Sequence, residues 1–151
     1  MVSDAIEFEV WGEAVPKRDG KPGPMMKTKS GKPFRMRRPD PTVVEWQQRI
    51  AREAQAAGVP YWEKGPVGIS IDFWFARPAA RRRGSQWKPT RSDADRLTTC
   101  VFDALEGVAV KRDAQFAELH TTKRYLDVDD PDGRPRAVIR LWQLPAVKEE
   151  K

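Results

Sequence analysis

Two aspartates stand one residue apart in the stretch RSDADRLTTCVFDAL, residues 91–105, just after a group of arginines. Asp93 and Asp95 repel each other, so a segment built only to bind an anion would have no use for both. If residues 93–95 are extended, their side chains point the same way and the two carboxylates converge. Such a pair needs a cation or a shared proton, and Mg²⁺ binds hard oxygen ligands of this kind. The pair therefore predicts a magnesium site.

A simpler role accounts for one of these aspartates. Asp95 can cap the helix that apolar residues at helical spacing predict from about residue 95. A cap leaves the second carboxylate without a role. Asp113, at the head of the following strand, supplies a third acid, and a bound metal would polarise a phosphate and activate water. Because D-x-D also occurs often by chance, spacing alone leaves the metal site and the cap as alternatives.

Positive charge is concentrated in two segments of the chain. There are 28 Lys and Arg residues against 22 Asp and Glu, a formal net charge of +6, which indicates an anionic partner and nucleic acid first. Segments 13–40 and 76–92 are predicted loops that bind DNA phosphates. The first is expected to be a long loop or a loop with a small hairpin, and the second contains no acid. A merely solvated basic surface is the alternative, and a membrane surface is disfavoured because neither loop forms an amphipathic helix. Trp87 would either stack on a base or pack against the protein. The candidate DNA-binding residues are Lys17, Arg18, Arg81, Arg82, Arg83, Lys88, Arg91 and Lys123.

The pattern of apolar residues predicts a small α/β (α+β) domain. With 151 residues the chain is expected to form one domain over 1–145, followed by a charged tail over 146–151. Helices are expected over 42–57, capped by Asp40 or Thr42, and over 95–105. Strands are expected over 5–11, 67–75, 114–125 and 137–144. This order predicts a mixed sheet of about four strands with two main helices packed on it.

The single cysteine and single histidine give no sign of other site chemistry. Cys100 falls on the apolar face of the second helix and is expected to be a core residue. With one cysteine there is no internal disulfide, which suits a reducing cytoplasm, and there is no Cys/His cluster for zinc. His120 is assigned a structural or surface role. The start of the chain lacks the features of a signal peptide, and no apolar run approaches the ~20 residues of a membrane span.

At residues 93–125 the chain resembles the RusA-type Holliday junction resolvases, which are common in phages and prophages. Their pattern is approximately D-x-D-N-L-x-K, then a D-A-L helix end, then D-D-[AS]-Q and a strand ending in Lys. The matching residues are Asp93, Asp95, Leu97, Asp103-Ala104-Leu105, Asp113-Ala114-Gln115 and Lys123. The resemblance implies that Asp93, Asp95 and Asp113 are catalytic and bind Mg²⁺, with Mn²⁺ as a substitute. It also implies a cytoplasmic homodimer that nicks opposite strands of four-way or other branched DNA.

Three positions depart from that pattern. The family asparagine is Arg96, the acid before the last aspartate is Arg112, and the motif lysine is Thr99. At i+4 from Asp95 a lysine would stabilise charge that develops on the phosphate, and threonine cannot. Either Arg96, Lys111 or Lys123 supplies this charge, or catalysis is weakened or lost and only DNA binding remains.

Asp103 and the stretch ELHTTK each allow a second interpretation. Asp103 lies two turns beyond Asp95, so a role in supporting the metal ligands or in closing the helix is expected rather than metal binding. A nuclease of the PD-(D/E)-x-K type is disfavoured, because the stretch ELHTTK has the wrong spacing.

Overall fold

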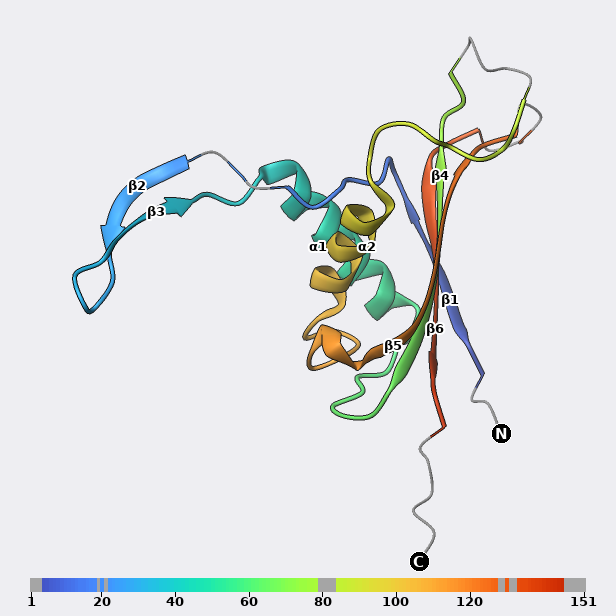
Figure 1. Ribbon diagram of the computed structural model, residues 1–151. Helices are drawn as coiled ribbons and strands as arrows, with labels where there is room; N and C mark the ends of the chain where they lie inside the picture. Colours follow the sequence, from blue (N-terminus) through green and yellow to red (C-terminus); the bar gives the residue numbers. More distant parts are fainter. Residues whose placement is uncertain are drawn as a thin grey trace, which may run out of the picture.

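The computed structural model describes residues 4–18, 20, 22–78, 84–127, 130 and 133–145, and for residue 37 the backbone alone. Four strands form one mixed sheet in the order β1-β6-β4-β5, in which β4 and β5 are parallel and the other neighbours antiparallel. Their bounds are β1 Ile6–Trp11, β4 Val67–Phe75, β5 Phe116–Tyr125 and β6 Arg136–Gln143. Helices α1, Pro41–Ala56, and α2, Ala94–Leu105, lie on one side of this sheet (Figure 1). The predicted small α+β domain with a mixed sheet is confirmed.

The apolar side chains that alternate along β4 form part of the core between the sheet and the helices. Val67, Ile69, Ile71, Phe73 and Phe75 are buried, while the residues between them from Ser70 onward are only partly buried. Side chains alternate between the two faces of a strand, so this apolar set points to one face. The buried residues of the two helices pack against it in a single cluster. Among the described residues, no helix is long and apolar enough to span a membrane.

The N-terminus of α1 is held by Asp40. Its carboxylate accepts hydrogen bonds from the backbone N–H groups of Thr42 at 2.9 Å and Val43 at 3.4 Å, so Asp40 is the cap of the two candidates. The Arg18 guanidinium donates from Nε to Asp40 Oδ2 at 2.7 Å. This hydrogen bond, ahead of the two backbone N–H donors, keeps the pKa of Asp40 below its usual value. Arg18 therefore serves the fold as well as any role on DNA.

The pKa of Asp40 is lower in the folded protein than in the unfolded chain. The ionised carboxylate should therefore stabilise the fold at pH values above the ordinary pKa, and this stabilisation should be lost as pH falls through the folded pKa. Asp40→Asn keeps a capping oxygen and removes the ion pair with Arg18. We expect the wild-type Tm to exceed that of Asp40→Asn at neutral pH and the gap to close as pH falls below the ordinary pKa of an aspartate and through the lowered folded pKa. Thermal melts across this pH range check the prediction, and parallel Tm curves would contradict it.

Helix α2 begins one residue earlier than expected. Asp93 is its N-cap residue, with φ −60° and ψ 132°, and Asp95 lies within the first turn. The expectation that Asp95 caps the helix and that residues 93–95 are extended is therefore wrong. Asp93 makes no side-chain hydrogen bond to the N–H groups at the helix start. Thr98 donates from Oγ1 to the Ala94 carbonyl, in the first turn, at 2.7 Å. Alternate side chains point the same way only in extended backbone, and α2 already begins at Ala94. The argument that the carboxylates of Asp93 and Asp95 converge therefore no longer holds.

Cys100 is fully buried on the inner face of α2, as expected for a core residue. Burial is the main cause that raises the pKa of its thiol to about 11. The native thiol should therefore react with a disulfide reagent slower by on the order of a hundredfold than the unfolded chain. Absorbance of the released thiolate, with and without denaturant, measures this ratio. Rapid reaction of the native protein would contradict it.

Two further strands form a hairpin outside the main sheet. Strands β2, Pro22–Lys27, and β3, Pro33–Arg37, are antiparallel and, among the residues that the structure describes, pair only with each other. The hairpin projects away from the helices and the sheet (Figure 1). Segment 13–40 was expected to be a long loop or a loop with a small hairpin, and the described part takes the second form. Of the remaining expectations, Arg81, Arg82, Arg83 and the tail at 146–151 lie outside the described residues.

Candidate active site

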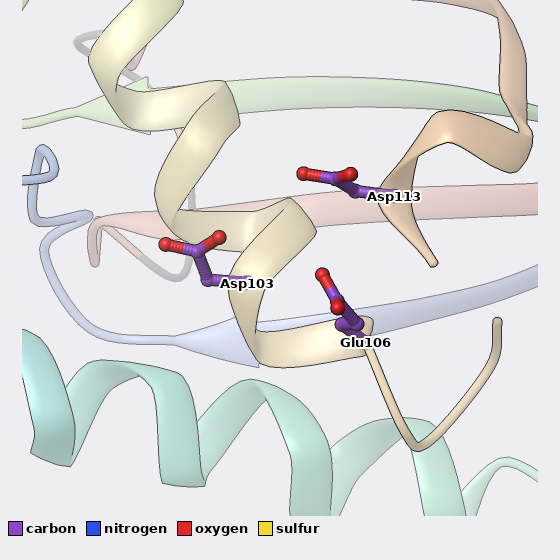
Figure 2. A group of neighbouring side chains, drawn as sticks. All are labelled: Asp103, Glu106 and Asp113. Carbon is purple, nitrogen blue, oxygen red and sulfur yellow. The ribbon is translucent and has the colours of Figure 1, made fainter. Parts of the chain in front are cut away.

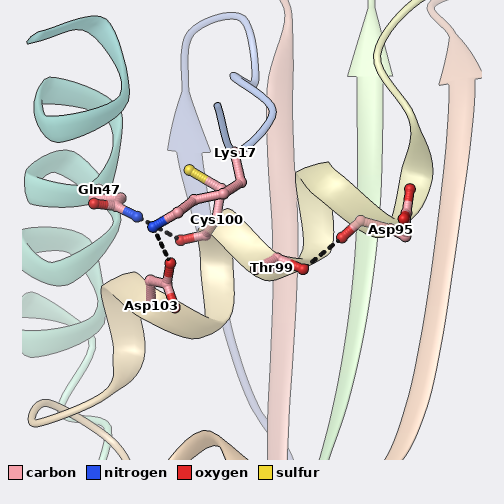
Figure 3. Close-up of polar contacts among 6 residues, drawn as sticks. All are labelled: Lys17, Gln47, Asp95, Thr99, Cys100 and Asp103. Carbon is pink, nitrogen blue, oxygen red and sulfur yellow. Dashed lines mark hydrogen bonds and ion pairs between the residues drawn. The ribbon is translucent and has the colours of Figure 1, made fainter. Parts of the chain in front are cut away.

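Polar side chains follow one exposed face of α2. Asp95, Thr99 and Asp103 are spaced four residues apart, so they lie in a row along the helix. Figure 3 shows Thr99 between the two aspartates, with its Oγ1 donating to the Asp95 carbonyl at 2.8 Å. The side chain at the family's lysine position is therefore engaged with the backbone of its own helix.

Three carboxylates gather at the C-terminal end of this row. Asp103 and Glu106 come from the end of α2, and Asp113 opens the short 3₁₀ helix η2, Asp113–Gln115, which faces them (Figure 2). One oxygen of each lies within 4.8 Å of the others. An all-carboxylate donor set of this kind suits a hard divalent cation such as Mg²⁺. The structure thus contains a group of acids that could hold a metal.

The predicted metal ligands lie at the two ends of α2. Eight residues separate Asp95 from Asp103, which corresponds to about 12 Å along a helix axis. Among the described residues, Asp113 forms a compact acidic group with Asp103 and Glu106, and Asp93 and Asp95 do not belong to it. The sequence did not single out Glu106, because no spacing rule links a helix end to a carboxylate seven residues on.

Positive groups lie beside the N-terminal end of α2. Arg96 Nε is 3.8 Å from Asp93 Oδ2, in a pair that is largely exposed. Lys123 on β5 donates from Nζ to the carbonyls of Thr90 at 2.8 Å and Arg91 at 3.3 Å, directly before Asp93. Partial burial is the main cause that lowers the pKa of Lys123.

The other candidate cations differ in their surroundings. Lys88 Nζ contacts the same two carbonyls as Lys123, those of Thr90 and Arg91, at 3.2 and 3.0 Å. Lys111 instead belongs to the turn that precedes Asp113. Of the three proposed substitutes for the missing lysine, Arg96 and Lys123 lie near the Asp93 end and Lys111 near the Asp113 end.

Lys17 brings a cation to the C-terminal group from a distant part of the chain. Its Nζ lies 2.6 Å from Asp103 Oδ2 (Figure 3). Its backbone N–H donates to the Arg96 carbonyl at 2.9 Å. The loop after β1 therefore runs along α2. Lys17 was assigned to DNA from composition alone. Its partner 86 residues away could not be inferred from sequence spacing.

Gln115 holds the turn that carries Asp113. Its Oε1 accepts from the backbone N–H groups of Lys111 at 2.9 Å and Arg112 at 3.0 Å. Its Nε2 donates to the carbonyls of Trp62 at 2.9 Å and Gly65 at 3.2 Å. The glutamine of the family pattern thus ties η2 to the segment before β4. The resemblance marked this residue without revealing why it is a glutamine.

Gln115→Leu removes all four hydrogen bonds and should lower the free energy of unfolding by about 1–3 kcal/mol. Because Asp113 then loses its fixed position, the DNA cleavage that the resemblance implies should fall while affinity for DNA is retained. Gln115→Glu keeps the two acceptor contacts and loses the two donors, so its effects should be intermediate. Urea unfolding and cleavage rates measure both, and wild-type rates in Gln115→Leu would exclude a positioning role.

Of the two expectations for Trp87, packing against the protein is observed, and stacking on a base stays a prediction. It is 50% exposed, and the Arg124 guanidinium lies 4.9 Å from its ring centroid, so one face packs on the protein. Arg124 also lies 5.4 Å from the ring centroid of Trp74. The Arg136 guanidinium lies 5.9 Å from the ring centroid of Trp74 and 5.3 Å from that of Trp11. Trp87 therefore ends a row of alternating tryptophan and arginine on the face of the sheet away from the helices.

Comparison with known proteins bears directly on this site. The family model described as Endodeoxyribonuclease RusA matches residues 18–141, which include α2, η2 and all three predicted catalytic aspartates. Among curated proteins, none matches the chain. Members of the matched family act on branched DNA, resolve Holliday junctions and depend on divalent metal ions. Since the match covers most of the chain, the protein belongs to the RusA endodeoxyribonuclease family.

Proposed function

We propose that this protein is a Mg²⁺-dependent endonuclease that resolves four-way DNA junctions by paired nicks in opposite strands. The observation that carries the proposal is the acidic face of α2, which has carboxylates at both ends and cations beside each end. Acids that hold a metal and cations that bind phosphate are the two groups that a metal-dependent nuclease uses. Mn²⁺ should substitute for Mg²⁺, and the cytoplasm of a bacterial or phage-infected host cell is the proposed setting.

We propose Asp93, Asp95 and Asp113 as the metal ligands, on the strength of the family pattern. Within one chain the length of α2 separates Asp113 from the other two, so these three do not form one compact group there. The competing set is Asp103, Glu106 and Asp113, which already lie together. Asp113 is common to both sets. When bound, Mg²⁺ would polarise the scissile phosphate and lower the pKa of a water molecule.

The chain's own cations have separate roles in this proposal. Arg96 and Lys123 would bind and orient the phosphate near the start of α2. Lys17, through its ion pair with Asp103, would keep the row of acids in place. These positive groups would also reduce the electrostatic repulsion among the nearby carboxylates while no metal is bound.

Paired nicks require two active sites at one junction. A four-way junction has approximate two-fold symmetry, so an isologous homodimer would present one site to each of two opposite strands. Sedimentation of the protein alone and with a junction tests this part of the proposal.

The function itself is tested on a synthetic four-way junction with each strand labelled in turn. In Mg²⁺ we expect nicks at symmetric positions in two opposite strands, and no cleavage of linear duplexes with the same arm sequences. EDTA should abolish the nicks and leave binding intact. Equal cleavage of junction and duplex, or cleavage in EDTA, would overturn the proposal.

A second candidate function is a junction-binding protein that has lost most of its catalytic power. The observation that favours it is Thr99, whose hydroxyl bonds the Asp95 carbonyl at the position where the family has an ammonium. Tight, junction-selective binding without nicks in either Mg²⁺ or Mn²⁺ would support this candidate against the first.

A further inference from the structure

The β2–β3 hairpin has two chemically distinct faces. Met26 pairs with Phe34, and Met36 shares their face because it is two residues from Phe34. On the opposite face Met25 pairs with Arg35, and Lys27 pairs with Pro33. One face is therefore apolar and the other carries positive charge.

The apolar face is open to solvent. Met26 and Phe34 are each 43% exposed and Met36 is 47% exposed, although all three are large apolar side chains. Within the described part of the chain, each hairpin strand makes its main contacts with the other strand. A two-stranded hairpin alone is only marginally stable in water, and exposed apolar faces of this kind mark interaction sites. A partner that covers this face would therefore stabilise the hairpin.

The turn of the hairpin is well defined. The Thr28 N–H donates to the Lys32 carbonyl at 2.9 Å, and Thr28 Oγ1 accepts from the Lys32 N–H at 3.1 Å. Gly31 has φ +83°, a conformation that glycine adopts without strain. The tip therefore presents Lys29 and Lys32 on a fixed turn rather than on a loose loop.

The charge of the hairpin favours DNA as the partner. The segment 22–37 contains Lys27, Lys29, Lys32, Arg35 and Arg37 and no acidic residue. Two such hairpins from two copies of the chain would repel each other, whereas a phosphate backbone neutralises them and releases counterions. Apolar wedges of Met and Phe beside positive side chains are a known means of binding unstacked base steps.

We infer that the hairpin recognises the branch point: its basic face binds phosphates, and Met26, Phe34 and Met36 insert against bases at the crossover. This inference rests on the proposed function. In a linear duplex the bases are stacked, and a wedge must first separate them. At a branch point the stacking is already interrupted, so the same wedge enters at lower cost. The hairpin would then supply selectivity for branched DNA, separately from the acids that cut it.

The test uses a four-way junction with 2-aminopurine beside the branch point, and a linear duplex with the same label. Both are titrated with full-length protein in EDTA. Wild-type protein should increase the fluorescence of the junction. The double variant Met26→Ala/Phe34→Ala should lose most of this increase and bind the junction on the order of tenfold more weakly, the effect of losing a stacking contact. Its affinity for the duplex should change by less than about twofold.

Met25→Ala is the matched control, because Met25 is adjacent to Met26, is 56% exposed and lies on the other face. It should keep the fluorescence increase. Phe34→Leu, which preserves an apolar pair with Met26, should also keep it. The retained duplex affinity of the double variant, to which the basic face of the hairpin contributes, shows that its loss of fluorescence is not unfolding of the hairpin. Lys27→Ala with Arg35→Ala should weaken junction and duplex alike and reduce the salt slope by about two, at ~0.9 for each phosphate contact.

Two results would overturn the inference. One is an undiminished fluorescence increase with Met26→Ala/Phe34→Ala. The other is a change of that variant from dimer to monomer in sedimentation, which would assign the hairpin to a second copy of the chain. Failure of the proposed function is distinguishable, because wild-type protein would then show no preference for the junction at all.

Discussion

Asp95→Asn and Asp113→Asn should each lower junction cleavage in Mg²⁺ by at least about a hundredfold, because each removes an anionic ligand from the proposed metal site. The amide keeps the shape of the side chain and loses its charge. Both positions are exposed, so the fold should be unaffected. Cleavage rates at saturating protein and junction affinity in EDTA measure the two effects separately. Affinity should be equal to or tighter than wild type, since a negative charge near the phosphates has been removed.

Glu106→Gln is the matched control for this prediction. Glu106 is an exposed acid that belongs to the compact group with Asp113 and lies outside the proposed ligand set. We expect it to retain cleavage within about tenfold of wild type, the lower range for groups beyond the direct ligands. If Glu106→Gln is as inactive as Asp113→Asn while Asp95→Asn still cleaves, the ion belongs to Asp103, Glu106 and Asp113. In that case the assignment of Asp93 and Asp95 as ligands is wrong.

Thr99→Lys should increase the cleavage rate by on the order of tenfold or more, because it places an ammonium one helical turn from Asp95. Thr99 is exposed, and its hydroxyl contacts only the backbone of the preceding turn, so the helix can accept the longer side chain. Thr99→Met is the control, since it matches the length and helix preference of lysine without the charge. The rates of both variants in Mg²⁺, relative to wild type, isolate the effect of the charge.

The outcomes at Thr99 also separate the two candidate functions. A wild type without cleavage and a Thr99→Lys variant that cleaves would identify a binding protein disabled at this position. Equal rates for Thr99→Lys and Thr99→Met in an active protein would show that another cation already supplies the charge. Lys123 is then the first residue to test. It lies on β5 beside the start of α2, and its ammonium is held 2.8 Å from the Thr90 carbonyl.

The sequence alone determined the main architecture of this protein, because regular strands and helices follow from local periodicity. The alternation in β4 and the helical spacing in α1 and α2 are properties of short segments, and the structure confirms them. The family was also accessible from sequence, since its pattern lies within residues 93–125. The start of α2 was missed by one residue, and with it the backbone conformation at Asp93 and Asp95. Helix ends are set by a balance of small local preferences, which sequence resolves poorly.

Only the tertiary structure decided which charged groups meet. Lys17 reaches Asp103 because the loop after β1 runs along α2, and Asp113 faces the end of α2 because Gln115 ties its turn to the segment before β4. These contacts join residues that are far apart in the chain, so no local pattern contains them. The two faces of the β2–β3 hairpin likewise depend on cross-strand register, which a single strand does not encode. Which of the acids along α2 bind the same metal ion therefore depends on where their side chains lie in the fold, and residue type alone does not decide it.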